Sequence, residues 1–393
     1  MLQYPIPVFL DSNIFIAAKY DFSSAGIFNV LLNLVKANKI KLYISSVVEG
    51  EVKKHINDEV NAFNSKFKKA RTETFKTVSE SYLTQWSFTH LFCKPDKKQM
   101  LEEFNQAFEQ LLLSTNAVVL DCTGVDCNQI IEDYFSGNPP FANSDNKRFE
   151  FPDAIMISKL KSVFSKDNPI FVISDDNKFR EALKNEPGFT TYETLKCIFD
   201  LINRENRIYA QVIEFLSQEN EHSQICIKIE EAIDAKGIEV DGFDYDRKGI
   251  CDGYDYDEVY LDSIKGLDFK MSSVDEITVD TVNLTVIVSA RISANCLFLD
   301  EDNSIWDSEE KEYIFSETRE IYEEHEVNFE CEIVLGLDNV YEDSKADFEF
   351  ISTNFAFVLD QETRVNRIWI PENDPAEDAH AEEMDTLEEY YKH

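Results

Sequence analysis

A chain of 393 residues is long for one domain, so its length favours two domains that each bury a core. Hydrophobic residues make up 43% of the sequence and include 30 Phe and 16 Tyr, which excludes a disordered chain despite a formal net charge of -38. Residues 1–200 carry 23 basic and 26 acidic side chains, whereas residues 201–393 carry 15 and 50. Because the second half would repel a polyanion, only the first half is suited to bind one.

The first half alternates short apolar runs with helical patterns, which is typical of βα units that build a parallel sheet. Strands are expected at residues 6–10, 41–45, 117–120 and 169–174 and near Thr190, and helices at 25–35, 152–164, from about 177, and at 195–202. From residue 47 to about 113 the pattern is mainly helical and Lys-rich, with an interruption near Lys94 and Pro95. We predict an α/β domain over residues 1–204, with helices flanking the parallel sheet and a helical insertion.

The second half changes to an acidic, strand-like texture. The segment DGFDYD at 241–246 returns as DGYDYD at 252–257, and alternating runs such as ITVDTVNLTVIVSARI predict antiparallel strands with one solvated face. Oxygen ligands at alternate positions of DGxDYD would suit calcium, but neither copy has the spaced Glu of a helix–loop–helix site, which favours acidic turns in a hairpin. We predict an acidic, mainly antiparallel β domain of the α+β class over residues 205–370 and a disordered acidic tail over 371–393.

Eight cysteines are scattered along the chain without a CxxC pair, and neither a secretory leader nor an apolar run of membrane length accompanies them. This pattern predicts reduced thiols in a cytoplasmic protein that does not enter a membrane. Cys122 and Cys127 are the close pair in the sequence, but they lack the nearby His or further Cys of a zinc site. We expect both to be buried core thiols.

Four acidic residues stand where the predicted sheet would bring them together. Asp11 follows the first strand in VFLDSN, and Asp176 follows the fourth strand in FVISDDNKF. Glu51 lies in the first turns of the helix after the second strand, and Asp153 lies at a helix start in FEFPDAIMISKL. Ligands of open α/β folds bind beyond the carboxyl ends of the strands, so we expect these carboxylates to converge. Such hard oxygen ligands suit Mg²⁺ or Mn²⁺, which can hold a phosphodiester and activate water.

These motifs together resemble a known family, the PIN domain, and in particular a larger bacterial PIN-like group with an EFPDA motif. The likeness rests on DSN after the first strand, a SxxxxxEV helix start, the EFPDA helix start and VxSxDxxF at a later strand end, and it covers about residues 5–200. Each motif is weak alone, but four in this order make a fairly specific match. The resemblance implies a metal-dependent nuclease, with RNA as a more frequent substrate than DNA, and many members are bacterial toxins or defence effectors.

Carried over residue by residue, the resemblance assigns the catalytic, metal-binding acids as Asp11, Glu51, Asp153 and Asp176. It assigns Asn13 and Ser174 as polar supports of the substrate site, and it implies Mg²⁺ or Mn²⁺ as the cofactor. We choose Lys147 and Arg148, just before FPDA, as the phosphate contacts. The chain departs from the family pattern at Lys178, where many PIN domains have another acid, so a second metal is expected to bind weakly or only with substrate.

Two of these assignments have competitors in the sequence. Glu49 competes with Glu51, but Ser46 and Glu49 have the spacing of a capping box, which gives Glu49 a structural role. Asp175 competes with Asp176, and the S-x-D spacing of the family favours Asp176.

Other candidates have plain structural explanations. Asp is favoured at helix starts, so Asp11 and Asp153 taken singly could be ordinary caps. The basic run Lys66, Lys68, Lys69 and Arg71 would either line a nucleic-acid groove or form a solvated helix face. His55, one turn beyond Glu51, would either assist the chemistry or lie on the surface.

The sequence therefore predicts a nuclease that hydrolyses nucleic-acid phosphodiesters by a metal-activated water, with an acidic second domain that regulates it or binds a protein partner. Three alternatives stay open: a PIN-like fold without catalysis that serves as a protein-binding scaffold, a flap-type DNA nuclease, and a small-molecule phosphatase. The phosphatase often uses an Asp nucleophile in a DxD arrangement, which DSN does not offer. A homo-oligomer is compatible with the sequence.

Overall fold

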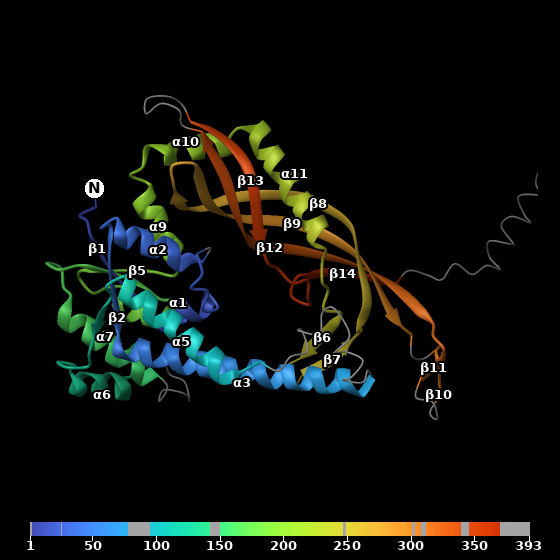
Figure 1. Ribbon diagram of the computed structural model, residues 1–393, viewed down its shortest axis with the longest axis horizontal. Coiled ribbons are helices and arrows are strands. Elements are labelled where there is room, and N and C mark those ends of the chain that lie inside the picture. The colour runs from blue at the N-terminus through green and yellow to red at the C-terminus, as the bar shows by residue number, and fades with distance from the viewer. Residues whose placement is uncertain are drawn as a thin grey trace, which may run out of the picture. The chain divides into compact units, whose positions relative to one another are not determined.

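The structure is a computed structural model that describes residues 2–24, 26–77, 95–141, 150–246, 249–300, 303–307, 312–338 and 346–369. The chain divides into two compact units, Met1–Glu205 and Asn206–His393, whose elements are labelled in Figure 1. None of the helices in the described ranges combines the length and apolarity that a bilayer span requires. The predicted tail at 371–393 lies outside the described residues.

The first unit is built on a parallel sheet of five strands in the order β3-β2-β1-β4-β5. The strands are β1 (Ile6–Leu10), β2 (Ile40–Ser45), β3 (Val118–Leu120), β4 (Ile170–Ile173) and β5 (Phe189–Tyr192). The predicted parallel sheet is confirmed. From β1 the chain proceeds through β2 and β3 on one side of the sheet and then returns to place β4 and β5 on the other. The strand order therefore reverses between β1 and β4, and such a switch point opens a crevice beyond the strand ends.

Helices flank this sheet, as predicted. They are α1 (Ser12–Ala17), α2 (Ile27–Lys36), α3 (Ser46–Thr77), α5 (Lys97–Ser114), α6 (Cys127–Ser136), α7 (Phe151–Val163), α8 (Asn177–Leu183) and α9 (Leu195–Asn203). The first turns of α3 bury an apolar stripe at every fourth residue, formed by Val48, Val52, Ile56 and Val60. This stripe seals the start of α3 onto the core, and the helix then extends well beyond it.

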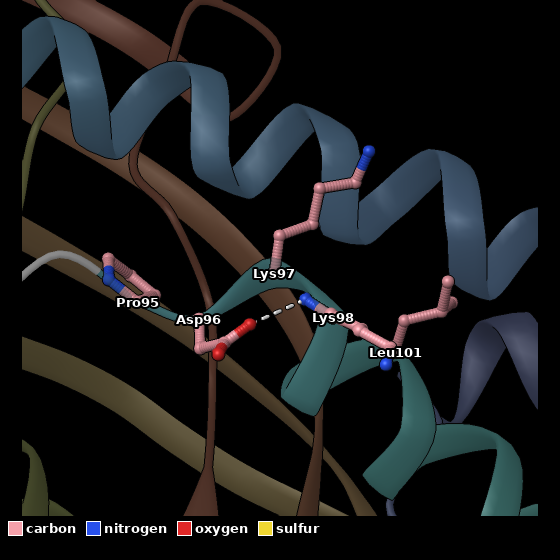
Figure 2. A pocket seen from close by; sticks show the side chains of 5 residues that line it. All are labelled: Pro95, Asp96, Lys97, Lys98 and Leu101. Carbon is pink, nitrogen blue, oxygen red and sulfur yellow. Dashed lines mark hydrogen bonds between the residues drawn. The ribbon is translucent and has the colours of Figure 1, made fainter.

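The structure describes the C-terminal end of the predicted interruption between the two long helices, where the second helix begins. Helix α5 begins at Lys97 behind Pro95, and Asp96 caps it by accepting hydrogen bonds from the backbone N–H groups of Lys98 and Gln99. Figure 2 shows the bond from Lys98. Asp96 also lines the pocket drawn in Figure 2. Because its carboxylate already accepts hydrogen bonds from the start of α5, its presence there is explained by helix capping and does not indicate a ligand site. Residues 78–94 lie outside the described part of the chain.

The second unit begins with helices that were not anticipated from the sequence, α10 (Arg207–Leu216) and α11 (Glu219–Lys236). Its main sheet is antiparallel, with the order β13-β12-β9-β8 and with β14 also paired to β12. The strands are β6 (Phe243–Asp246), β7 (Gly249–Gly253), β8 (Tyr256–Ile277), β9 (Thr281–Leu299), β10 (Ile305–Asp307), β11 (Glu312–Phe315), β12 (Thr318–Asp338), β13 (Asp347–Phe355) and β14 (Arg364–Trp369). The predicted antiparallel, α+β character is confirmed.

The three long strands of this sheet differ in regularity. Along β12 buried and more exposed residues alternate over most of its 21 residues, as expected for one packed and one wet face. The 22-residue β8 instead shifts register five times against β9. The apolar side of α11, formed by Ile225, Ile229 and Ile233, is buried in the same core as the sheet.

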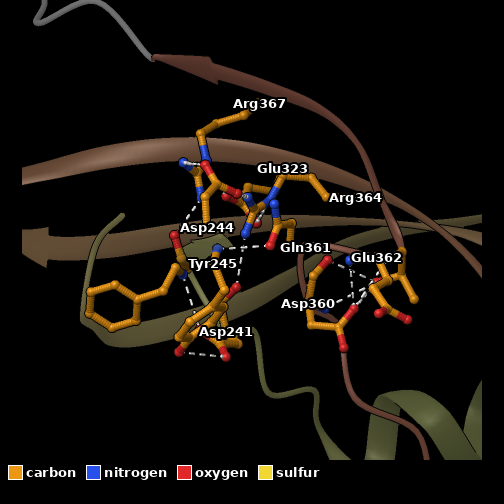
Figure 3. Close-up of polar contacts among 12 residues, drawn as sticks. Asp241, Asp244, Tyr245, Glu323, Asp360, Gln361, Glu362, Arg364 and Arg367 are labelled. Carbon is orange, nitrogen blue, oxygen red and sulfur yellow. Dashed lines mark hydrogen bonds and ion pairs between the residues drawn. The ribbon is translucent and has the colours of Figure 1, made fainter. Parts of the chain in front are cut away.

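The first DGxDYD copy contributes β6, which pairs with β7 in an antiparallel hairpin, so the expected hairpin is present, although Phe243–Asp246 of this copy form a strand rather than a turn. Asp244 accepts hydrogen bonds from Arg364 and Arg367 of β14, and both arginines also bind Glu323 of β12, which is fully buried (Figure 3). Burial would raise the pKa of Glu323, but hydrogen bonds from His325 and other neighbours lower it to about 2. The network ties the hairpin to the sheet and gives Asp244 a structural role in place of a calcium ligand.

One prediction about the cysteines is wrong. Cys122 and Cys127 are exposed rather than buried in a core. Cys122 follows β3, which is an edge strand, and Cys127 begins α6, so the chain around them is covered on one side only.

Candidate metal centre

The ends of β1 and β4 set the position of the candidate centre. The two strands are hydrogen-bonded neighbours, with Leu10 opposite Ile173. Asp11 follows the first and Ser174 to Asp176 follow the second, so both segments leave the sheet at the same edge. The switch point of the strand order therefore brings together residues that are more than 160 positions apart in sequence.

Asp11 is the most buried acid of this edge, with 3% of its surface exposed. Its Oδ1 accepts a hydrogen bond from the N–H of Ser12 at 2.7 Å, and its Oδ2 accepts from the Ser174 hydroxyl at 2.6 Å and the Asn13 amide at 2.9 Å. Burial raises the pKa of Asp11 to about 6, against these hydrogen bonds and with help from the negative charges of Glu51 and Asp176. Asp11 caps α1 and faces the other acids at the same time.

Asn13 and Ser174 serve as internal supports. The Asn13 side chain also donates to Ser174 Oγ at 3.2 Å, and its carbonyl oxygen accepts from the N–H of Asp175 at 3.1 Å. Ser174 is fully buried and accepts from the N–H of Asp176 at 3.2 Å. These bonds position the two strand ends and their acids, as expected of polar supports, and a contact of either side chain with substrate stays a prediction.

The start of α7 supplies two further acids. Pro152 lies in the first turn, where a proline is readily accommodated, and Asp153 lies one residue beyond it. Glu150 is the N-cap residue of α7, but its side chain makes no capping hydrogen bond. Because residues three apart lie on the same side of a helix, Glu150 and Asp153 point in a common direction.

Asp176 completes the tightest part of the centre. It is the N-cap of α8, where its Oδ1 accepts from the N–H groups of Lys178 at 2.6 Å and Phe179 at 3.2 Å. One carboxylate oxygen from each of Glu150, Asp153 and Asp176 lies within 4.8 Å of the others. We call these three residues together with Asp11 and Glu51 the acidic centre.

Asp153 is the member of the acidic centre with the largest rise in pKa. Burial and, in decreasing order, the charges of Asp11, Glu51, Asp176 and Glu150 together raise its pKa to about 8. No hydrogen-bond donor for Asp153 is found among the described residues. A partly buried carboxylate without a donor, facing other carboxylates, fits a divalent cation of the hard, oxygen-binding type.

Glu51 and its competitor Glu49 take different roles. Glu51 is half-buried, and its charge acts on both Asp11 and Asp153. Glu49 instead forms an ion pair with Lys53 at 2.9 Å. The predicted capping box is wrong in detail, because Ser45 rather than Ser46 caps this end by accepting from the N–H of Val48 at 3.1 Å. The cap shifts by one residue since α3 starts directly at the end of β2.

Glu150 is the functional candidate that sequence reasoning missed. The EFPDA motif contains it three positions before Asp153, and that spacing was the available signal. Lys178 explains part of its environment, because its Nζ forms an ion pair with Glu150 at 2.8 Å. Lys178, which stands where many PIN domains have another acid, thus places its positively charged ammonium group beside the acidic centre.

Those of the remaining sequence candidates that the structure describes are not part of the acidic centre. Asp175 is exposed and is not among the three clustered carboxylates, which agrees with the choice of Asp176. His55 is exposed on α3, and so are the lysines of the basic run, Lys66, Lys68 and Lys69. Lys147 and Arg148 lie in the segment 142–149, outside the described residues.

Fold and centre together define an α/β domain with a carboxylate site at its topological switch point. Comparison with known protein families gives this domain a name. Residues 8–179 match the family model of the PIN domain, so the first unit carries a PIN domain, which is a nuclease-type fold. The match contains all members of the acidic centre. No curated protein and no solved structure matches the chain.

Proposed function

We propose that this protein is a divalent-metal-dependent nuclease that hydrolyses nucleic-acid phosphodiesters. The observation that carries the proposal is the meeting of Glu150, Asp153 and Asp176 within 4.8 Å, next to Asp11 and Glu51, in a PIN domain. A cluster of acids of this kind costs stability in the absence of a cation, so a functional reason for it is favoured.

The residues divide into ligands and supports. Glu150, Asp153 and Asp176 would hold the cation, with Asp11 and Glu51 setting the negative potential around it. A bound Mg²⁺ or Mn²⁺ supplies an electrophile for the phosphodiester and lowers the pKa of an attacking water. Ser174 and Asn13 keep the two strand ends in register, so that the carboxylates need not reorganise when substrate binds.

The substrate proposal is RNA in preference to DNA, and it rests on the family alone. The first unit is nearly neutral, whereas the second half of the sequence holds 50 acidic and 15 basic residues. Because such a surface repels nucleic acid, we assign the second unit to regulation or to binding a protein partner. A toxin or defence role would suit a nuclease with a built-in regulatory unit.

The test is cleavage by the full chain of labelled single-stranded RNA, single-stranded DNA and a branched DNA, with Mn²⁺, Mg²⁺ or a chelator present. We expect metal-dependent cleavage that Asp153→Asn and Asp11→Asn abolish. Asp175→Asn is the matched control, because it removes an exposed carboxylate next to Asp176, and Glu49→Gln is a second control on α3. Both controls should cleave like the wild type.

Three results would contradict the proposal. Cleavage that persists in Asp153→Asn would point to another site or a contaminating enzyme. Wild-type protein that binds Mn²⁺ but cleaves none of the substrates would favour a protein-binding scaffold. Cleavage confined to the branched DNA would replace RNA by a flap-type substrate.

A further inference from the structure

A second group of potential metal ligands lies in the other unit, between α11 and β8. His222 and Cys226 are one helical turn apart on α11, and Asp268 lies on β8, which packs against this helix. A ring nitrogen, the Sγ atom and a carboxylate oxygen of these residues lie within 4.8 Å of one another. We propose that His222, Cys226 and Asp268 bind a thiophilic divalent cation of the Zn²⁺ type. This thiolate site is independent of the proposed nuclease function.

The imidazole and the carboxylate are held in place by their surroundings. The His222 ring stacks on Phe269 at a centroid distance of 4.1 Å, and its Nε2 lies 2.7 Å from Asp268 Oδ1. Phe269 is 4% exposed, so this stacking surface is part of the core. The backbone N–H of Phe269 also donates to Asp268 Oδ1 at 2.9 Å. Two of the three ligands are therefore oriented before any cation arrives.

The sulfur atom of Cys226 is the potential metal ligand that distinguishes this site from an ordinary ion pair. An ion pair of His222 with Asp268 needs no thiol, yet Cys226 lies beside both groups. Burial raises the pKa of the Cys226 thiol to about 11, and the charges of Asp268 and Glu230 contribute. A thiol in such a setting is a poor nucleophile, because the thiolate is disfavoured unless a cation compensates it.

The donor set selects the ion. Sulfur and imidazole donors favour Zn²⁺ over Mg²⁺, which prefers oxygen alone as at the acidic centre. Binding would release one proton from Cys226, and the resulting thiolate and the Asp268 carboxylate would balance the two positive charges of the ion. Three protein ligands leave a fourth position for water, and Glu230, one turn beyond Cys226 on α11, lies on the same side of the helix.

The site would join α11 to the strand β8. A cation that binds only the folded chain stabilises it by mass action, so Zn²⁺ should raise the thermal stability of the protein. In this way the second unit would respond to the supply of a metal different from the one that the acidic centre prefers.

The test is titration of the reduced full chain with Co²⁺, because only a thiolate ligand gives the sulfur-to-cobalt charge-transfer absorption. The acidic centre has oxygen ligands and does not contribute to this signal. We expect a saturable signal whose final intensity corresponds to one thiolate-bound Co²⁺ per chain, displacement by Zn²⁺ and not by Mg²⁺, and loss of the signal in Cys226→Ser and His222→Ala. Cys127→Ser, which removes an exposed thiol elsewhere, should keep the signal.

A second pair of variants guards against misfolding. Asp268→Asn should weaken the Co²⁺ complex. Asp262→Asn, which removes an exposed carboxylate on the same strand, should leave the complex unchanged. Circular dichroism checks that each variant is folded. The proposal is overturned if the wild type gives no charge-transfer signal, if Cys226→Ser retains it, or if Asp268→Asn and Asp262→Asn bind Co²⁺ equally.

Discussion

Replacing Asp153 by Asn should stabilise the metal-free protein. The carboxyl of Asp153 has a pKa of about 8 because of burial and four neighbouring acids, against an ordinary value of 3.8. Between these two pH values the folded chain retains a proton that the unfolded chain has lost. The wild type therefore loses stability as the pH rises from about 4 to 8, and the neutral Asn variant lacks this particular loss.

The size of the effect follows from the same numbers. One pH unit of difference in pKa corresponds to about 1.4 kcal/mol, so the range from 3.8 to about 8 sets an upper limit of about 6 kcal/mol. The carboxyl is partly exposed and titrates together with its neighbours, and solvent screening reduces the cost. We expect Asp153→Asn to raise the free energy of unfolding by about 2–3 kcal/mol at about pH 8.5, with no gain below about pH 4.

The assay is urea unfolding of the full chain in EDTA across this pH range, with Asp175→Asn as the control for loss of an exposed charge. Saturating Mn²⁺ should reverse the order, because the cation stabilises the wild type and Asp153→Asn binds it poorly. The reasoning is refuted if Asp153→Asn in EDTA is no more stable than the wild type at about pH 8.5, or if its advantage does not grow with pH.

Three further outcomes are expected. Ser174→Ala removes a hydrogen bond from a buried carboxylate and should weaken Mn²⁺ binding by about 10-fold or more in calorimetric titration. Lys178→Met removes a cation beside the acidic centre and frees its partner Glu150, so Mn²⁺ should bind several-fold more tightly while the metal-free protein becomes slightly less stable. Glu323→Ala leaves two arginines without their shared carboxylate and should cost about 3–5 kcal/mol in chemical denaturation. The exposed Glu326→Ala should cost less than about 1 kcal/mol in the same measurement.

The fold of the first unit was predictable because its signals are local. Each buried strand is a short apolar run, and in a parallel sheet the residues after such runs gather at one edge. This is why Asp11 and Asp176 could be placed together without coordinates. Glu150 escaped notice since it lies outside the helix proper, as its N-cap, and its relation to Asp176 depends on how α7 meets α8.

The second unit was harder to predict, for two reasons. Its helix α11 carries Ile225, Ile229 and Ile233 at four-residue spacing, but the acidic composition around them masked the helical period. The partner of His222 and Cys226 is Asp268, some 40 residues away on a strand whose register no local pattern fixes. Contacts of this kind follow from strand pairing, which a single sequence specifies only weakly.

The irregular pairing of β8 has a consequence for solubility. In the order β13-β12-β9-β8 this long strand lies at the end of the sheet, where an even ladder of unpaired N–H and C=O groups would recruit other chains. Its register shifts bend the ladder repeatedly, and exposed charges such as Glu258, Lys265 and Lys270 accompany the bends. An incoming strand would have to match each kink and desolvate each charge, so β8 resists the edge-to-edge association that leads to aggregation.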